Sequence, residues 1–238
     1  EARRAGYRVD QWRLSNGVRA LRRLYREYPA AVPELKAYET WVLLLAEQAG
    51  IDAGYEENGP AWTAAAALDE LWAARSRMNA YGQSLLVLAL DLAKDPRGSD
   101  AARDLEAGVT RKGDLAWWTS ERDPLLFDAV DTGVEATAFA VKALSARDPK
   151  HPVLEPAVRW LLLNRTFGVY WASTKQTAMV LTGLLDLMKA RRESAAGAVV
   201  EVSVNGAPAG THRFTAASLT APEPAEFVVP AQAGVNRI

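Results

Sequence analysis

The sequence contains no cysteine among its 238 residues. Disulfide bonds, thiolate zinc sites and a cysteine nucleophile are therefore excluded within this chain. The absence of cysteine does not fix the cellular compartment, because many secreted bacterial proteins also lack cysteine. Histidine is nearly as scarce, since the chain holds His151 and His212 alone, 61 residues apart. A histidine metal site or catalytic dyad would need the fold to unite them, so we interpret both as solvated loop or strand residues.

Excess charge and long apolar runs are also missing. Lys plus Arg total 28 and Asp plus Glu total 29, which leaves no basic footprint for nucleic acid and no polybasic membrane patch. No apolar run approaches the roughly 20 residues of a membrane span. The first residues, EARRAGYRVD, show neither an initiator Met nor a signal-peptide pattern. We therefore expect Glu1, and likewise the ending AGVNRI, to be cut points within a longer protein.

The sequence changes character near Ala195 and predicts two domains, 1–194 and 195–238. Before this point apolar residues recur at intervals of three and four residues, as on one face of a helix. After it, the stretch AVVEVSVNGAPAGTHRF alternates like a strand, with Asn205-Gly206 as a hairpin turn. AEFVVP predicts a later strand. Roughly 43 residues of short strands make a poor core of their own, so we expect an incomplete antiparallel β segment that is completed elsewhere or packs on the helices.

The helical region repeats at intervals of 40 to 53 residues. Four apolar runs each carry a small hydroxyl residue, namely Thr40, Ser84, Thr137 and Thr177. They lie at 38–48, 81–93, 134–146 and 175–188 and predict inner helices, and the amphipathic segments 16–28, 62–75, 100–107 and 153–164 predict outer ones. Alternating buried and amphipathic helices indicate an α/α-toroid, with an open solenoid as the alternative. An aspartate at Val141 or Leu181 should then unfold the domain.

The stretch WASTKQTAMVL could be an active-site loop or a helix start. Ser173 and Gln176 have the spacing of a capping box, in which the hydroxyl accepts from the backbone amide and the Gln side chain returns the bond. Thr132 and Glu135 repeat this spacing before the preceding inner helix. No histidine or cysteine stands near Ser173 or Thr174 to activate a hydroxyl. We therefore interpret WASTKQTAMVL as a helix start.

A long connection at 108–131 is the second candidate site. It holds Trp117, Trp118 and the carboxylates Glu121, Asp123 and Asp128. Paired aromatics and carboxylates could line a sugar site, and long loops in compact domains are often functional. The favoured interpretation is a β-hairpin flap whose tryptophans cover the rim of the toroid.

In chain order, several segments resemble the thioester-containing domain of the α2-macroglobulin and complement superfamily. They are MNAYGQSLLVLAL, AWWTSERD, DTGVEATAFAVKALSA and VLEPAVRWLLLNRTFGVYWASTKQTAMVLTGLLDL. Arg159, Trp160, Leu161, Ser173, Thr174, Gln176 and Thr177 sit on the family's strongest signature. The resemblance is good over 36–193 and thin over 1–35, and the β segment resembles the region after this domain in bacterial members.

Two departures qualify what the resemblance implies. The family's Gly-Gly-Tyr-Gly turn reads FGVYWAS here. The family's thioester joins the Cys and Gln of a Cys-x-Glu-Gln motif. This chain has no cysteine and cannot form that bond. Either the motif lies in a part of the parent outside this chain, or the parent belongs to the thioester-less bacterial branch. In complement-type members, a histidine just before the first matching inner helix steers the thioester toward hydroxyls, and no histidine precedes His151 here. The resemblance therefore implies that a parent thioester would be attacked directly by amines, such as the lysines of a protease.

The resemblance implies a non-catalytic module of a bacterial α2-macroglobulin-like, broad-range protease inhibitor, periplasmic or extracellular. Its expected partners are target proteases, through the full-length parent, and other domains of the same chain, with no nucleic acid and no direct membrane insertion. We assign no catalytic, cofactor-binding or metal residue and no cofactor. The alternative is a toroid enzyme. A terpenoid cyclase needs an Asp-rich motif, a prenyltransferase needs a zinc-binding Cys, and a glycoside hydrolase needs facing carboxylates from Glu121, Asp123 or Asp128.

Overall fold

The computed structural model describes residues 6–28, 32–51, 62–120, 133–192, 196–215, 217 and 226–238. The chain divides into two compact units, Glu1–Leu187 and Met188–Ile238, and each is considered by itself. The described part is mainly helical with two short antiparallel strand pairs. The predicted fold class, mainly α with a small β segment, is confirmed.

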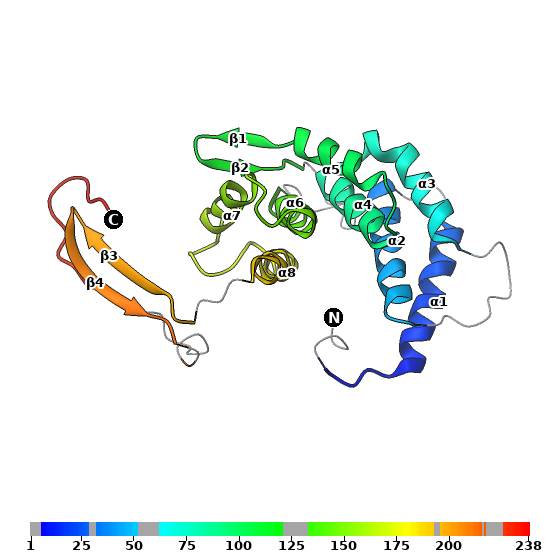
Figure 1. Cartoon of the computed structure of the whole chain (residues 1–238), viewed down its shortest axis with the longest axis horizontal. Coiled ribbons are helices and arrows are strands. Elements are labelled where there is room, and N and C mark those ends of the chain that lie inside the picture. Colours follow the sequence, from blue (N-terminus) through cyan, green and yellow to red (C-terminus); the bar gives the residue numbers. More distant parts are fainter. Residues whose placement is uncertain are drawn as a thin grey trace. The chain divides into compact units, whose positions relative to one another are not determined.

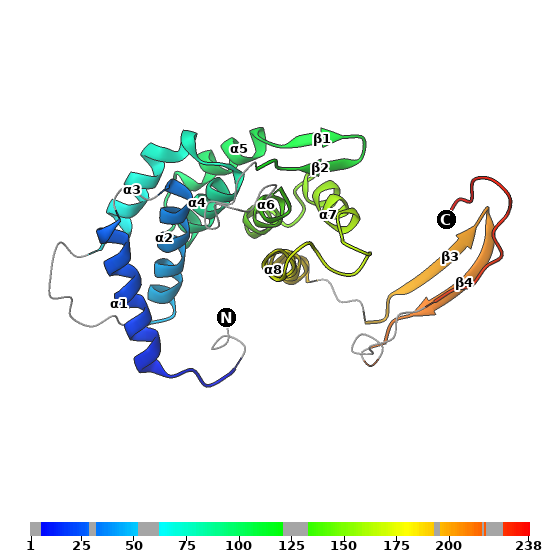
Figure 2. The same cartoon turned by 180° about the vertical axis from the view of Figure 1, so that it is seen from behind.

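The first unit is a two-layer array of helices (Figure 1). The outer layer consists of α1 (Gln11–Glu27), α3 (Ala64–Ala74), α5 (Gly98–Ala107) and α7 (Leu154–Leu163). The inner layer consists of α2 (Pro33–Gln48), α4 (Ala80–Leu92), α6 (Gly133–Arg147) and α8 (Thr174–Arg191). Figures 1 and 2 show the array curving, with α1 and α8 at its two ends. The alternation of inner and outer helices matches the predicted one segment by segment.

Side-chain caps mark where α1, α3 and α4 begin. The backbone amide of Arg13 donates to the Asp10 carboxylate at 3.0 Å, at the start of α1. The amide of Gly82 donates to the Asn79 side chain at 3.0 Å, at the start of α4. The Thr63 hydroxyl caps α3 in the same way. Each cap satisfies a donor that has no intrahelical partner.

The inner layer is buried in its centre and uncovered at one end. In α6, 12 of 15 residues are buried, and Val141 is fully enclosed. Phe139 of this helix meets Trp41 and Tyr81, with ring centroids 5.9 and 5.0 Å apart, so aromatic side chains fill the space between α2, α4 and α6. In α8, by contrast, the side chain of Leu181 is 48% exposed. The prediction that aspartate at Leu181 unfolds the domain is therefore wrong, because no described helix covers that face of α8.

A short hairpin follows the outer helix α5. It pairs β1 (Thr110–Lys112) with β2 (Leu115–Trp117) in antiparallel register. Gly113 stands first in the two-residue turn with φ of +60°, the conformation that such a turn requires of that position. The predicted hairpin in this connection is confirmed.

The second unit is built on the pair β3 (Val199–Val204) and β4 (Ala207–Arg213). Asn205 and Gly206 form the predicted turn, with φ of +54° and +81°. AEFVVP is not a strand: its described residues form no ladder with β3 or β4. The ring of Phe227 instead lies over Gly210, where any larger residue would collide with it. Pro230, which has no N–H to donate, suits this irregular path better than a ladder.

Candidate functional site

The start of α8 holds the sequence's main candidate site. The backbone amide of Gln176 donates to the Ser173 hydroxyl at 3.1 Å, so the predicted cap is confirmed. The reciprocal bond of the capping box is not formed. The Gln176 side chain instead donates at 3.0 Å to the carboxylate of Glu135 in α6, where only 4% of that residue is exposed. A buried carboxylate needs donors more than an exposed helix start does.

Trp171 ties the same helix start to the preceding outer helix. Its indole N–H donates at 2.9 Å to the carbonyl of Leu161, in the last turn of α7. Its backbone amide donates to the Thr177 hydroxyl at 3.2 Å, and that hydroxyl donates back to the Trp171 carbonyl at 3.5 Å. The hydroxyl therefore serves both polar groups of one peptide residue and is engaged in structure.

The same arrangement occurs one repeat earlier. The indole N–H of the fully buried Trp118 donates at 2.7 Å to the Leu105 carbonyl, in the last turn of α5. The Trp118 amide donates at 3.0 Å to the Thr137 hydroxyl, which donates back to the Trp118 carbonyl at 3.5 Å. In both repeats an indole satisfies a helix-end carbonyl and an inner-helix threonine fixes the tryptophan backbone. Two of the four hydroxyls that mark the repeat are thus clamps for a tryptophan.

These contacts lead to a stability prediction for Ser173. Ser173→Ala should lower the free energy of unfolding by about 0.5–2 kcal/mol, because it removes a helix cap. Ser173→Asp should retain most of the stability, because a carboxylate caps and suits the positive helix N-terminus. Chemical denaturation measures both. A stable Ala variant together with a weakened Asp variant would contradict the cap.

Carboxylates at the starts of the inner helices are also engaged. The Glu34 carboxylate of α2 accepts from the backbone amide of Asn79 at 2.9 Å, beside the start of α4. The Asn79 side chain in turn donates to the Ser120 hydroxyl at 3.3 Å. Glu135, besides its bond from Gln176, lies 3.9 Å from the Lys175 ammonium. Thr132 lies outside the described residues, so the second capping box remains a prediction.

The described half of the flap supports a covering role for its tryptophans. Trp117 stacks on Trp160 of α7, with ring centroids 5.8 Å apart and planes inclined by 10°. Trp118 is enclosed beneath the hairpin's end, with no exposed surface. The three carboxylates proposed for a sugar site lie outside the described residues: Glu121, Asp123 and Asp128.

The two histidines lie in different units. His151 precedes α7, where its Nδ1 accepts from the Val153 amide at 3.4 Å and its Nε2 lies 3.4 Å from the Glu106 carboxylate. His212 lies on β4, edge-on to Phe214 with ring centroids 4.6 Å apart. Within the described ranges, no three His, Cys, Asp or Glu residues gather as a metal ion would require.

A charged cluster, buried except at Glu70, lies between α1, α2 and α3, and sequence analysis missed it. The Tyr25 hydroxyl donates to the Glu70 carboxylate at 2.8 Å. The Lys36 ammonium donates to the Tyr25 carbonyl and lies 3.7 Å from the centroid of that ring. Glu39 is 7% exposed, and its Oε2 has no hydrogen-bond partner among the residues that the structure describes. Lys36 and Glu39 stand three residues apart, where helical side chains are neighbours, at the start of the apolar run 38–48, and this spacing was the available signal.

The pKa of Glu39 is raised, chiefly by burial, against the opposing charge of Lys36 and with a contribution from Glu70. Ionised Glu39 therefore weakens the fold above its raised pKa, and this penalty disappears as the pH falls below the pKa of the unfolded chain. We expect Glu39→Gln to be more stable than the parent at pH 7, and the difference to vanish near pH 4. Urea midpoints across pH test this, with the exposed Glu27→Gln as control. A constant difference at every pH would refute it.

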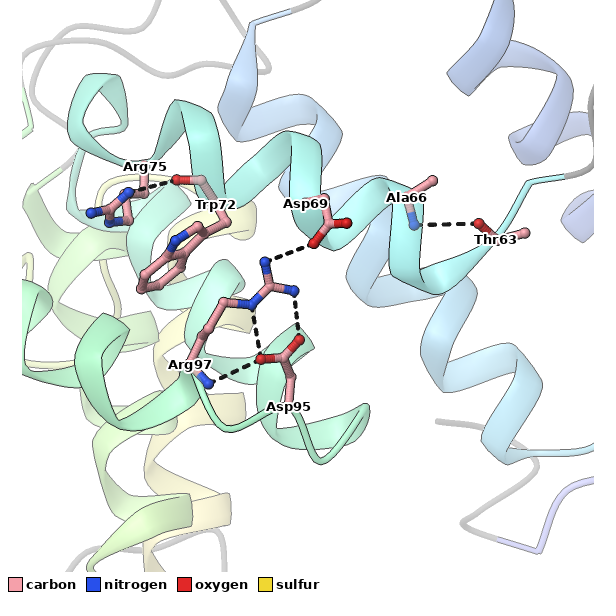
Figure 3. Close-up of polar contacts among 7 residues, drawn as sticks. All are labelled: Thr63, Ala66, Asp69, Trp72, Arg75, Asp95 and Arg97. Carbon is pink, nitrogen blue, oxygen red and sulfur yellow. Dashed lines mark hydrogen bonds and ion pairs between the residues drawn. The ribbon is translucent and has the colours of Figure 1, made fainter.

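The outer helix α3 carries a cation–π cluster formed by Trp72, Arg75 and Arg97, which we call the Trp72 lock (Figure 3). The guanidinium carbons of Arg75 and Arg97 lie 4.1 and 5.6 Å from the Trp72 ring. Arg97 also pairs with Asp95 at 2.6 Å and with Asp69 of α3 at 2.8 Å. Its hydrogen bonds are the main reason that the pKa of Asp95 is lowered. The lock connects α3 to the turn before α5.

A pocket of about 230 Å³ opens beside the lock. Its lining residues are Arg75, Ser76, Gln83, Leu86, Ala101 and Asp104. Arg75 is paired with Asp104 at 3.5 Å. The lining holds a single carboxylate, whereas glycoside hydrolysis uses two across the scissile bond. This pocket does not supply the geometry of the enzyme alternative.

Together these features define a class of protein: a two-layer helical module whose conspicuous Ser, Thr and Trp residues hold successive helices together. Comparison with known protein families identifies the family to which this helical module belongs. Residues 35–186 match the model of the A-macroglobulin TED domain, the thioester-containing domain of the α2-macroglobulin and complement superfamily. The match covers more than half of the chain, which belongs to this family.

A comparison with curated protein sequences gives no match. The family is typically extracellular or secreted, and its TED domain is generally a non-enzymatic inhibitor module. Among the described helices, none combines the length and the apolarity needed to cross a bilayer.

Proposed function

We propose that this chain is a non-catalytic module of a bacterial α2-macroglobulin-like, broad-range protease inhibitor that traps proteases. The observation that carries the proposal is the start of α8, where Ser173 caps a helix and Thr177 clamps the backbone of Trp171. Ser173, a hydroxyl that could have been catalytic, has a structural role as a helix cap, and the family match supplies the class of protein. The expected compartment is the periplasm or the extracellular space.

The physical basis of such trapping is a set of domain contacts with two stable arrangements. Cleavage of a bait segment elsewhere in the parent would release this module, which would then engage the attacking protease together with the other domains. A module with this role needs a rigid body. The tryptophan clamps at the ends of α5 and α7 and the Trp72 lock at α3 support that rigidity.

The test uses the full-length protein and trypsin. Cleavage of a large protein substrate should slow when the full-length protein is added, and a variant lacking residues 6–238 should lose this effect. Undiminished trypsin activity with the intact protein would refute the proposal.

The enzyme alternative is tested on the 238-residue chain itself. Screening against glycans and polyprenyl diphosphates should give no turnover. A hydrolysis or cyclisation rate abolished by Glu121→Gln or Asp128→Asn would establish the enzyme instead.

A further inference from the structure

The turn between α7 and α8 holds a phenylalanine in a conformation that phenylalanine disfavours. Thr166 and Tyr170 form a bridge, and Phe167 and Gly168 occupy the turn with φ of +52° and +72°. Glycine adopts such angles freely, whereas the Cβ of a bulky residue crowds its own backbone there. Strained residues of this kind concentrate at functional positions, which makes Phe167 a candidate for function.

The side chain of Phe167 gains no compensating burial within the first unit. Phe167 is 87% exposed and Val169 is 73% exposed. Leu163, at the end of α7, and Tyr170 are 67% and 46% exposed. We call these four residues the aromatic turn. Four neighbouring apolar side chains that face solvent, one of them at the expense of backbone strain, indicate a surface that another molecule or domain covers.

The charge around the aromatic turn restricts what can cover it. Residues 156–185 contain the cations Arg159, Arg165 and Lys175 and no Asp or Glu. Arg159 is paired with Asp114. Arg165 donates its Nε to the Leu162 carbonyl at 2.9 Å, and no carboxylate in the described ranges lies within ion-pair distance of it. A cation beside exposed apolar groups suits a partner that has carboxylates around an apolar pocket.

We propose that the aromatic turn docks into an apolar pocket with an acidic rim on another domain of the full-length protein. The inference rests on the proposed function in one respect, namely that this chain is a module of a larger protein. A protein pocket is favoured over a lipid surface, because one short turn with the single cation Arg165 beside it provides far less than stable membrane anchoring requires. Phe167, exposed in the turn that the bridge between Thr166 and Tyr170 closes, has the form of an anchor side chain.

Thiol labelling tests the docking, since the 238-residue chain has no cysteine of its own. Val169→Cys is placed in this chain and in the full-length protein, with the exposed Ala73→Cys of α3 as the matched control. Labelling at each site is measured by peptide mapping. A turn that is docked about 90% of the time should label about tenfold more slowly at position 169 in the full-length protein. Position 73 should label at similar rates in both.

Phe167→Gly separates docking from folding. Glycine accepts a φ of +52° without strain, so the urea midpoint of the 238-residue variant should be unchanged or higher. In the full-length protein the same substitution should restore fast labelling at position 169. Slow labelling that survives Phe167→Gly would overturn the proposal, because Phe167 would not be the anchor.

Other outcomes distinguish the competing explanations. Equal labelling of position 169 in the chain and in the full-length protein overturns the docking. Protection of position 169 by phosphatidylglycerol vesicles alone overturns it in favour of a membrane, and protection that grows with the concentration of the 238-residue chain overturns it in favour of a second copy. A full-length protein that shields position 169 without slowing trypsin would refute the proposed inhibitor and leave the docking intact.

Discussion

Val141→Asp should unfold the helical array at room temperature. Val141 lies in the middle of α6 with 0% exposure, so the new carboxylate would have neither water nor a partner. An unpaired buried charge costs several kcal/mol, a large share of the roughly 5–15 kcal/mol that hold a domain together. The expected result is loss of the cooperative thermal transition, followed by circular dichroism at 222 nm.

Leu181→Asp is the matched control for this experiment. Leu181 also lies mid-helix in an apolar run, but its side chain is 48% exposed on the uncovered face of α8. Surface substitutions usually change stability by less than about 0.5 kcal/mol, so this variant should melt close to the parent. If Val141→Asp melts like the parent as well, α6 is not the buried centre of the inner layer.

The contrast between Val141 and Leu181 shows how far the sequence predicts the fold. Apolar periodicity located the described α-helices within a few residues, because the spacing of apolar residues along a segment shows that it is helical and which of its faces can be buried. It could not predict which apolar face has a neighbour. The runs of α6 and α8 look alike in sequence, and their burial differs because α6 lies within the array and α8 at its end.

The candidate site was predictable where its geometry is local. The Ser173 cap depends on residues three apart, and the spacing predicted it. The partner of the Gln176 side chain is Glu135, 41 residues away, and only the packing of α6 beside α8 brings them together. The tryptophan clamps are long-range for the same reason, since Trp118 and Thr137 meet across the connection between two helices.

Gly183→Ala should destabilise the array by about 1–3 kcal/mol, although alanine is the better helix former. Gly183 of α8 lies against the backbone of α6, and a Cβ there would stand 2.6 Å from the backbone oxygen of Ala138. Because backbone cannot rotate away as a side chain can, one of the helices must shift. Nearby, Lys142 of α6 is paired with Asp186 of α8, so a shift would also disturb that ion pair. Chemical denaturation measures the loss.

The matched control is Gly17→Ala in α1. Gly17 lies in a helix interior, and no atom of the described residues outside its own helix backbone lies within 4 Å of the position of a Cβ. Replacing it should raise the free energy of unfolding by about 0.5–1 kcal/mol, the helix propensity gain alone. The same substitution in two helices is thus expected to have opposite signs. A gain in stability at both positions would mean that α8 does not pack against the backbone of α6 at Gly183.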